Sequence, residues 1–423
     1  MIFETIKQNL LNEKIIFGKH ETGLKIYIMP KKNFSKSYTL YATQYGSVDN
    51  NFTVFGENFI VPDGIAHFLE HKLFEEEDTS AFSNFAETGA ITNAFTDFHM
   101  TAYLFSCTND FYKNLEYLIN FVNKPYFTEQ NIQKEIGIIE QEIKMCDDDP
   151  EWRVFHNLLN GMYKKNSINK DICGTVKSIS KITADLLYKC YNTFYNNANM
   201  ALVIVGDVDE NKVIESIEKH IKTQNKEIEI LRNYPEEPFK CNKNFLKQRM
   251  SISMPIFEIG FKHNNFIKKN LLKVEIIQEI ILEILFGKSS ELYMDLYEKN
   301  LINENFYTSS NIEKIYNFTV IGGKSKNPYK VHEMVIKNIK KILNDGIEQS
   351  LIDRAKKYIL GSHIKIYDNL EEIGNMLIRT IFREVNLFDS IDMLKNVNQN
   401  EIMEALCEYN LTDNVLSVIE PIN

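Results

Sequence analysis

The sequence lacks paired cysteines. Its 423 residues include six cysteines at widely separated positions, and none of them forms a Cys-x-x-Cys pair. This spacing argues against a disulfide scaffold and against a cage of cysteines around zinc. Scattered single cysteines are typical of proteins from a reducing compartment. We therefore expect a cytoplasmic protein.

An excess of positive charge and long apolar runs are also missing. The formal net charge is −10 at pH 7, whereas nucleic-acid binders present a basic face to phosphates and anionic membranes attract basic segments. No apolar run approaches the ~20 residues that span a bilayer. The first residues, Met1 to Thr5, include an acidic residue and no apolar core of signal-peptide length. We expect neither nucleic acid nor a membrane as a partner.

The remaining composition is that of a folded globular protein, with 44% hydrophobic and 25% charged residues. Strand-like and helix-like segments alternate up to residue 207. A polar stretch rich in Lys and Asn follows, and beyond it the order of elements recurs. We predict an α+β fold of two similar halves, each a mainly antiparallel sheet flanked by helices. The predicted bounds are 1–225 for the first domain, 226–234 for a linker and 235–423 for the second domain.

One motif indicates a metal site with a catalytic base. His67-Phe68-Leu69-Glu70-His71 falls in a segment with helical periodicity that runs from Asp63, a potential helix cap, to Phe74. In a helix, positions i and i+4 lie one above the other, so both imidazoles can reach a shared metal ion. Glu70 flanks the same face and can take a proton from metal-activated water. This order of residues is the inverted zincin motif, and it predicts one Zn²⁺ per chain.

A third protein ligand is expected from the predicted helix at 128–147. Its apolar stripe is formed by isoleucines at helical spacing, and carboxylates flank the stripe on both sides. Glu135 and Glu142 lie at one edge, and Glu129 and Glu140 lie at the other. Helical geometry alone leaves both pairs open as sources of the ligand.

The sequence resembles the insulinase/pitrilysin metallopeptidases, a group that includes mitochondrial processing peptidase. The resemblance rests on His67 to Glu75, on Glu135 to Glu142, and on two further segments, 171–175 and 199–208. It is closest to the half-length bacterial members. It implies zinc ligation by His67, His71 and Glu142, and a general-base role for Glu70. Glu135 matches a carboxylate that orients a ligand histidine.

The resemblance also implies a substrate and partners. Asn93, Ala94, Phe95 and Thr96 match the edge strand on which the family binds peptides by β-augmentation. The family usually presents an Arg and a Tyr from its second half, yet the matching stretch 292–300 contains no Arg, and Tyr307 is a weak candidate for the phenol.

We expect a zinc-dependent endopeptidase for short or unfolded peptides, held in a cleft between the two halves. It would work as a homodimer or as a heterodimer with a related chain. The alternative is a non-catalytic or assembly subunit of a paired peptidase complex.

Overall fold

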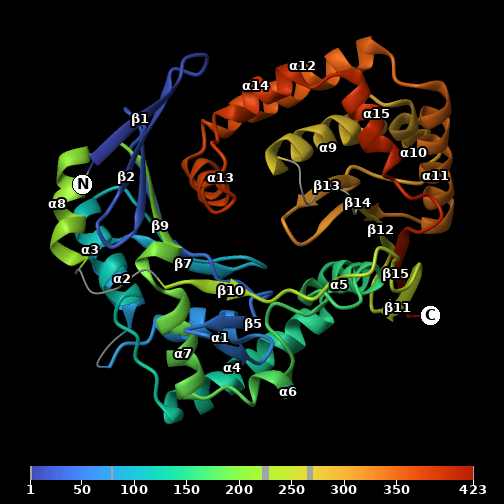
Figure 1. The fold of residues 1–423 in the computed structure, drawn as a ribbon. Coiled ribbons are helices and arrows are strands. Elements are labelled where there is room, and N and C mark those ends of the chain that lie inside the picture. Colours follow the sequence, from blue (N-terminus) through green and yellow to red (C-terminus); the bar gives the residue numbers. More distant parts are fainter. Residues whose placement is uncertain (1, 78–79, 222–227, 264–269, 423) are drawn as a thin grey trace. The chain divides into compact units, whose positions relative to one another are not determined.

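The computed structural model describes residues 2–77, 80–221, 228–263 and 270–422. The chain forms two compact units that interleave along the sequence. The first unit contains Met1–Ile143, Asp171–Tyr234 and Ile364–Leu387. The second contains Lys144–Lys170, Pro235–His363 and Phe388–Asn423. Figure 1 shows the elements that build each unit.

The first unit is built on a seven-stranded sheet in the order β1-β2-β3-β9-β4-β8-β7. All neighbouring strands are antiparallel except β3 and β9, which are parallel. The strands are β1 (Ile2–Gln8), β2 (Glu13–Lys19), β3 (Lys25–Pro30), β9 (Met200–Gly206), β4 (Ser37–Thr43), β8 (Thr101–Cys107) and β7 (Ile91–Thr96). A separate small sheet has the order β10-β5-β6, from β10 (Ile230–Arg232), β5 (Asn51–Val54) and β6 (Glu57–Ile60).

Helices cover both faces of the seven-stranded sheet. Because side chains alternate along β4, Tyr41 points into the large apolar core that also holds Phe68 and Leu69. On the other face of β4, Gly374 packs closely against the ring of Tyr38. The helices of this unit are α1 (Ile65–Leu73), α2 (Ala81–Thr88), α3 (Phe111–Val122), α4 (Glu129–Asp148, whose last turn enters the second unit), α6 (Val176–Ile179), α7 (Ala184–Phe194), α8 (Glu210–His220) and α13 (Leu370–Phe382).

The second unit repeats this plan with a five-stranded sheet in the order β11-β15-β12-β14-β13. Only the β11–β15 pair is parallel. The strands are β11 (Phe245–Met250), β15 (Val415–Pro421), β12 (Ile256–Lys262), β14 (Asn317–Lys324) and β13 (Tyr307–Ile312). The helices are α5 (Pro150–Met162), α9 (Leu271–Phe286), α10 (Glu291–Glu298), α11 (Pro328–Asp345), α12 (Gln349–Ile366, whose last turn enters the first unit), α14 (Asp389–Asn396) and α15 (Gln399–Cys407).

Each unit contains a helix that comes from the other half of the chain. Helix α5 packs on β12 and β15 of the second unit, where Gly260 leaves room for Leu158 and Met162. Helix α13 packs on β4 and β9 of the first unit. The predicted α+β fold, with two similar halves that each contain a mainly antiparallel sheet flanked by helices, is confirmed.

Two connecting segments have local structure of their own. Helices α12 and α13 are separated by a break at 367–369, where Asn369 caps the start of α13 by accepting from the backbone N–H groups of Glu371 and Glu372. Of the predicted linker 226–234, residues 226–227 lie outside the described residues, and residues 230–232 form β10. The predicted domain bounds of 1–225 and 235–423 stay a prediction.

Candidate metal centre

Helix α1 carries both motif histidines. Its N-cap residue is Gly64, whose φ of 92° lies in the left-handed region that favours glycine. A Cβ there would lie 2.4 Å from the carbonyl oxygen of Cys173, so the start of the helix is packed against residues 173–174. Asp63 was expected to cap this helix; instead its Oδ1 accepts a hydrogen bond of 2.6 Å from the side chain of Asn50.

The imidazoles of His67 and His71 lie side by side on one face of α1. Their ring centroids are 4.6 Å apart, while the intervening Phe68 and Leu69 are buried in the core on the opposite face. This core packing fixes which face of the helix the histidines occupy. The helical spacing in the sequence therefore places the two imidazoles next to each other on the helix surface.

Glu142 of α4 completes the arrangement. Its Oε1 lies 3.5 Å from Nε2 of His67, and its Oε2 lies 3.5 Å from Nε2 of His71. Two ligand atoms of a tetrahedral zinc site with bonds of ~2.0–2.1 Å are separated by about 3.3 Å. Each of the two histidine–carboxylate distances is close to this value, and each involves a different oxygen of Glu142. The types of donor are those of catalytic zinc.

The carboxylates on the two edges of α4 have different partners in the structure. Glu135, which shares an edge with Glu142, places Oε1 3.1 Å from Nδ1 of His71. Glu129, from the opposite edge, accepts a hydrogen bond of 3.0 Å from the backbone N–H of Ala184 at the start of α7. The structure thus brings Glu135 and Glu142 to the histidines, a choice that the sequence pattern left open.

Glu135 is held between His71 and Lys72. The Lys72 side chain is fully buried, with Nζ 3.6 Å from Oε2 of Glu135, and it also forms an ion pair with Glu75. Burial raises the pKa of Glu135, but the hydrogen bond with His71 and the charges of His71 and Lys72 outweigh burial and lower the pKa below its ordinary value. A carboxylate that stays ionised there fixes the His71 ring with Nε2 toward Glu142. In the described part of the chain, Nδ1 of His67 has no such partner.

Glu70 lies beside the histidines and is only 8% exposed. Burial raises the pKa of its carboxyl group, and the charge of His67 and a hydrogen bond from Thr96 oppose this effect without cancelling it. That hydrogen bond spans 2.6 Å from Oγ1 of Thr96 to Oε2 of Glu70. A carboxylate with a raised pKa is a better proton acceptor near neutral pH.

The predicted peptide-binding strand is β7, which lies at the edge of the seven-stranded sheet and beside α1. Asn93 is exposed, and Ala94, Phe95 and Thr96 are half-buried. Within the described residues, β7 pairs only with β8. The geometry is that of a strand with one unpaired backbone edge, and a role in binding peptides stays a prediction.

Cys173, which was not among the predicted site residues, also lies at the centre. Its side chain is 5% exposed, and its Sγ lies 3.9 Å from Nε2 of His67 and 4.0 Å from Oε1 of Glu142. These three residues each offer a ligand atom, and the atoms lie within 4.8 Å of one another. The sequence holds no local signal for this, because Cys173 lies far along the chain from both partners.

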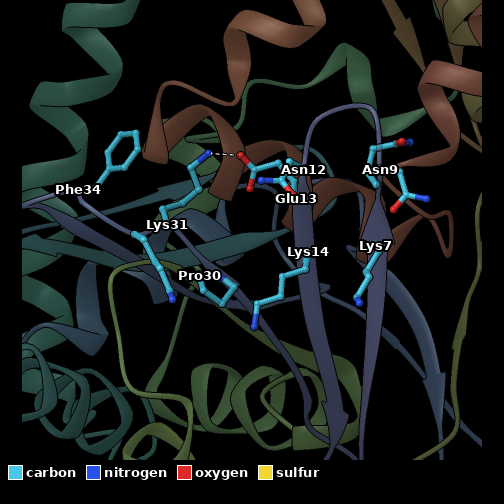
Figure 2. A pocket seen from close by; sticks show the side chains of 10 residues that line it. Lys7, Asn9, Asn12, Glu13, Lys14, Pro30, Lys31 and Phe34 are labelled. Carbon is cyan, nitrogen blue, oxygen red and sulfur yellow. Dashed lines mark hydrogen bonds and ion pairs between the residues drawn. The ribbon is translucent and has the colours of Figure 1, made fainter.

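Two further features belong elsewhere in the molecule. In the second unit, Tyr307 is 44% exposed and its hydroxyl donates to Glu258, which is buried in β12. In the first unit, a polar pocket of about 550 Å³ lies at the β1–β2 hairpin (Figure 2). Lys31 of this pocket pairs with Glu13 and donates to the carbonyl oxygen of Tyr367 at 2.8 Å, so its charge is already compensated.

Comparison with sequence families gives two matches. The family described as "Insulinase (Peptidase family M16)" matches residues 62–176, and "Peptidase M16 inactive domain" matches residues 181–359. The first match contains all the residues of the candidate centre. No helix within the described ranges combines the length and the apolar character needed to cross a membrane.

Individual proteins resemble the chain over its whole length. The uncharacterized zinc protease YmfH of Bacillus subtilis (strain 168) is 41% identical over 421 residues, which cover 97% of this chain and 98% of that protein. The crystal structure of an M16-like peptidase from Alicyclobacillus acidocaldarius superimposes with a TM-score of 0.94 at 31% identity and covers 100% and 99% of the two chains. Pitrilysin shares the fold with a TM-score of 0.76 at 14% identity, where this chain matches 46% of the longer one.

Proposed function

Because the chain belongs to the insulinase family of M16 peptidases, we propose that it is a zinc-dependent endopeptidase for short or unfolded peptides. The observation that carries the proposal is that His67 and His71 each place Nε2 3.5 Å from the carboxylate of Glu142. The printed name of the B. subtilis relative, a zinc protease, supports zinc as the metal.

In this proposal each residue has one role. His67, His71 and Glu142 hold the zinc ion, one per chain, and Glu135 orients His71 through its Nδ1. When bound, zinc would acidify a water molecule and polarise the peptide carbonyl. Glu70 accepts the proton of that water and later delivers it to the leaving amine. Strand β7, with Asn93 to Thr96, binds the peptide backbone by strand addition.

The working unit is proposed to contain two chains, either two copies or this chain with a related one. The stretch 292–300, where the family usually has an arginine, contains none. The hydroxyl of Tyr307 is already bonded to Glu258. The chain also matches just under half of pitrilysin. A second chain would supply the group that polarises the substrate carbonyl.

The second candidate function is a non-catalytic or assembly subunit. The match of residues 181–359 to the inactive domain of M16 peptidases supports it, as does the missing arginine. The complete set of His67, Glu70, His71 and Glu142 supports the enzyme, because a subunit that only assembles has no need for a buried base beside two histidines.

The test is a peptidase assay on zinc-loaded protein with a mixture of unstructured peptides, alone and with a related chain of similar length. We expect one zinc per chain and cleavage that the Glu70→Gln variant abolishes while it keeps its zinc. The matched control is Glu140→Gln, which removes a carboxylate from α4 and should leave cleavage unchanged. Zinc binding without cleavage under either condition would favour the assembly subunit.

A further inference from the structure

The sulfur of Cys173 lies near two of the residues that are proposed to hold zinc, His67 and Glu142. For a tetrahedral zinc site with Zn–S of ~2.3 Å and Zn–N of ~2.0–2.1 Å, sulfur and nitrogen are separated by about 3.6 Å. The observed separations are 3.9 Å to Nε2 of His67 and 4.0 Å to Oε1 of Glu142. The ligand atoms of Cys173, His67 and Glu142 thus lie within 4.8 Å of one another, in one small volume.

The loop that carries this sulfur is fixed to the start of α1. Gly174 has a φ of 75°, and a Cβ there would lie 2.4 Å from the carbonyl oxygen of Asp63. Gly64 meets the carbonyl oxygen of Cys173 in the same way. Two glycines therefore let the backbones approach so closely that no side chain fits between them.

Hydrogen bonds hold the same loop. Oδ1 of Asp171 accepts from the backbone N–H of Cys173 at 2.9 Å, and the hydroxyl of Ser178 donates to the carbonyl oxygen of Asp63 at 2.7 Å. The segment 171–178 is thus tied to the residues that immediately precede the metal-binding helix. The place of the thiol beside His67 follows from this packing, and a side chain that is 5% exposed has few alternative positions.

We propose that Cys173 binds the metal as a fourth protein ligand while no peptide is bound. This inference rests on the metal site of the proposed function. As the sulfur–metal bond forms, the thiol releases its proton to solvent, and the sulfur takes the position that water would otherwise occupy. Zinc with four protein ligands is typical of structural sites, whereas hydrolytic zinc has three and a water.

The consequence is a resting state that is closed to hydrolysis. Peptide or partner binding must displace the sulfur before Glu70 can meet a water molecule at the centre. Because Cys173 is held through residues 63–64 and 171–178, any movement of this loop relative to α1 would change the distance between its sulfur and His67. The position of the loop 171–178 would therefore determine whether the thiol of Cys173 binds the metal.

X-ray absorption at the zinc edge tests the proposal directly on the zinc-loaded full chain without peptide. We expect one sulfur neighbour at ~2.3 Å together with nitrogen and oxygen neighbours at ~2.0–2.2 Å. Cys173→Ser and Cys173→Ala should lose the sulfur neighbour, and the dissociation constant for zinc should rise at least about tenfold. The matched control is Cys107→Ser, because Cys107 is also 5% exposed and belongs to the same unit; it should keep the sulfur neighbour.

The cobalt-substituted protein gives a second readout. A sulfur-to-cobalt charge-transfer band in the near ultraviolet is expected for the wild type and for Cys107→Ser, and its absence is expected for both Cys173 variants. Zinc bound by the wild type through nitrogen and oxygen alone would overturn this inference and leave the proposed peptidase intact. A sulfur neighbour that persists in folded Cys173→Ser would also overturn it. A wild type that binds no zinc would overturn both proposals.

Discussion

Thr96 Oγ1 lies 2.6 Å from Oε2 of Glu70 and donates a hydrogen bond to it. The two residues come from different elements, strand β7 and helix α1. Thr96 is itself braced by Thr101, whose hydroxyl lies 3.2 Å away and bonds onward to the carbonyl oxygen of Tyr45. The proposed base is therefore positioned by the same strand that is proposed to bind the peptide.

The Thr96→Val substitution should shift the acid limb of the pH profile of kcat/KM to higher pH. The hydrogen bond from Thr96 lowers the pKa of Glu70, so its removal raises that pKa further. A hydrogen bond to a charged group contributes ~1.5–3 kcal/mol, so its loss should have a measurable effect. Since Glu70 must be ionised to accept a proton, kcat/KM should fall on the acid side and recover at higher pH. A pH profile of kcat/KM measures the shift.

Thr92→Val is the control for this experiment. It makes the same substitution on the same strand, but the hydroxyl of Thr92 donates to the backbone carbonyl of Leu104 at 2.9 Å. Its pH profile should match that of the wild type. Equal profiles for both variants would show that Thr96 does not control the base.

Glu135→Gln should weaken metal binding without removing a metal ligand. The substitution keeps the shape of the side chain but removes the charge that holds His71 through Nδ1, 3.1 Å away. Loss of such an orienting partner typically costs 10–100-fold in metal affinity. Competition with a chelator measures the dissociation constant for zinc. Glu140→Gln, on the same helix, should bind zinc as the wild type does, and equal losses in the two variants would contradict the role of Glu135.

How much of the site the sequence predicts depends on the range of each contact. His67 and His71 are four residues apart, and helical geometry alone places them on one face. The choice between the two carboxylate pairs of α4 needs the position of α1 against α4, which the amphipathic pattern does not contain. Cys173 is 106 residues from His67, and only the packing of Gly64 against residues 173–174 brings its sulfur to the centre.

The fold shows the same division between local and long-range information. Helix α5 has clear start signals in the sequence, since Asp149 caps it and Pro150 occupies its first position. The sheet against which it packs was not predictable. An apolar helix face records that it is buried but not against what, and both α5 and α13 pack on the sheet formed mainly by the other half of the chain.

Gly174→Ala should destabilise the chain more than an ordinary glycine substitution. A φ of 75° is unfavourable for alanine, and the new Cβ would also lie 2.4 Å from the carbonyl oxygen of Asp63. Gly89→Ala is the control, because Gly89 has a φ of 69° but nothing within 4 Å of the added Cβ. The control isolates the backbone cost of ~1–3 kcal/mol. The midpoint of thermal unfolding should fall further for Gly174→Ala. Equal decreases in the two variants would show that the loop around Gly174 accommodates the added Cβ without a further cost.

Because Glu258 is buried in the second unit, we expect the stability of the folded chain to depend on pH. This side chain is 2% exposed, and burial raises its pKa from an ordinary 4.5 to about 8. Between these two values the folded chain keeps a proton that the unfolded chain has lost. The contribution of Glu258 is therefore fully present below pH 4.5, declines as pH rises by up to about 1.4 kcal/mol per unit, and is lost once pH passes about 8.

Glu258→Gln tests this relation because it keeps the neutral shape at every pH. The midpoint of thermal unfolding of the variant should rise relative to the wild type as pH increases from 5 to 8, and the difference should stay constant above that range. Glu291→Gln is the control in the same unit, since the Glu291 side chain is 88% exposed and should show no such trend. If the difference between Glu258→Gln and the wild type were the same at pH 5 and pH 8, the carboxyl group would have to titrate at its ordinary pKa despite its burial. The hydrogen bond from Tyr307 would then have to offset the whole cost of burying the charge, and Tyr307→Phe would restore the trend by removing the donor.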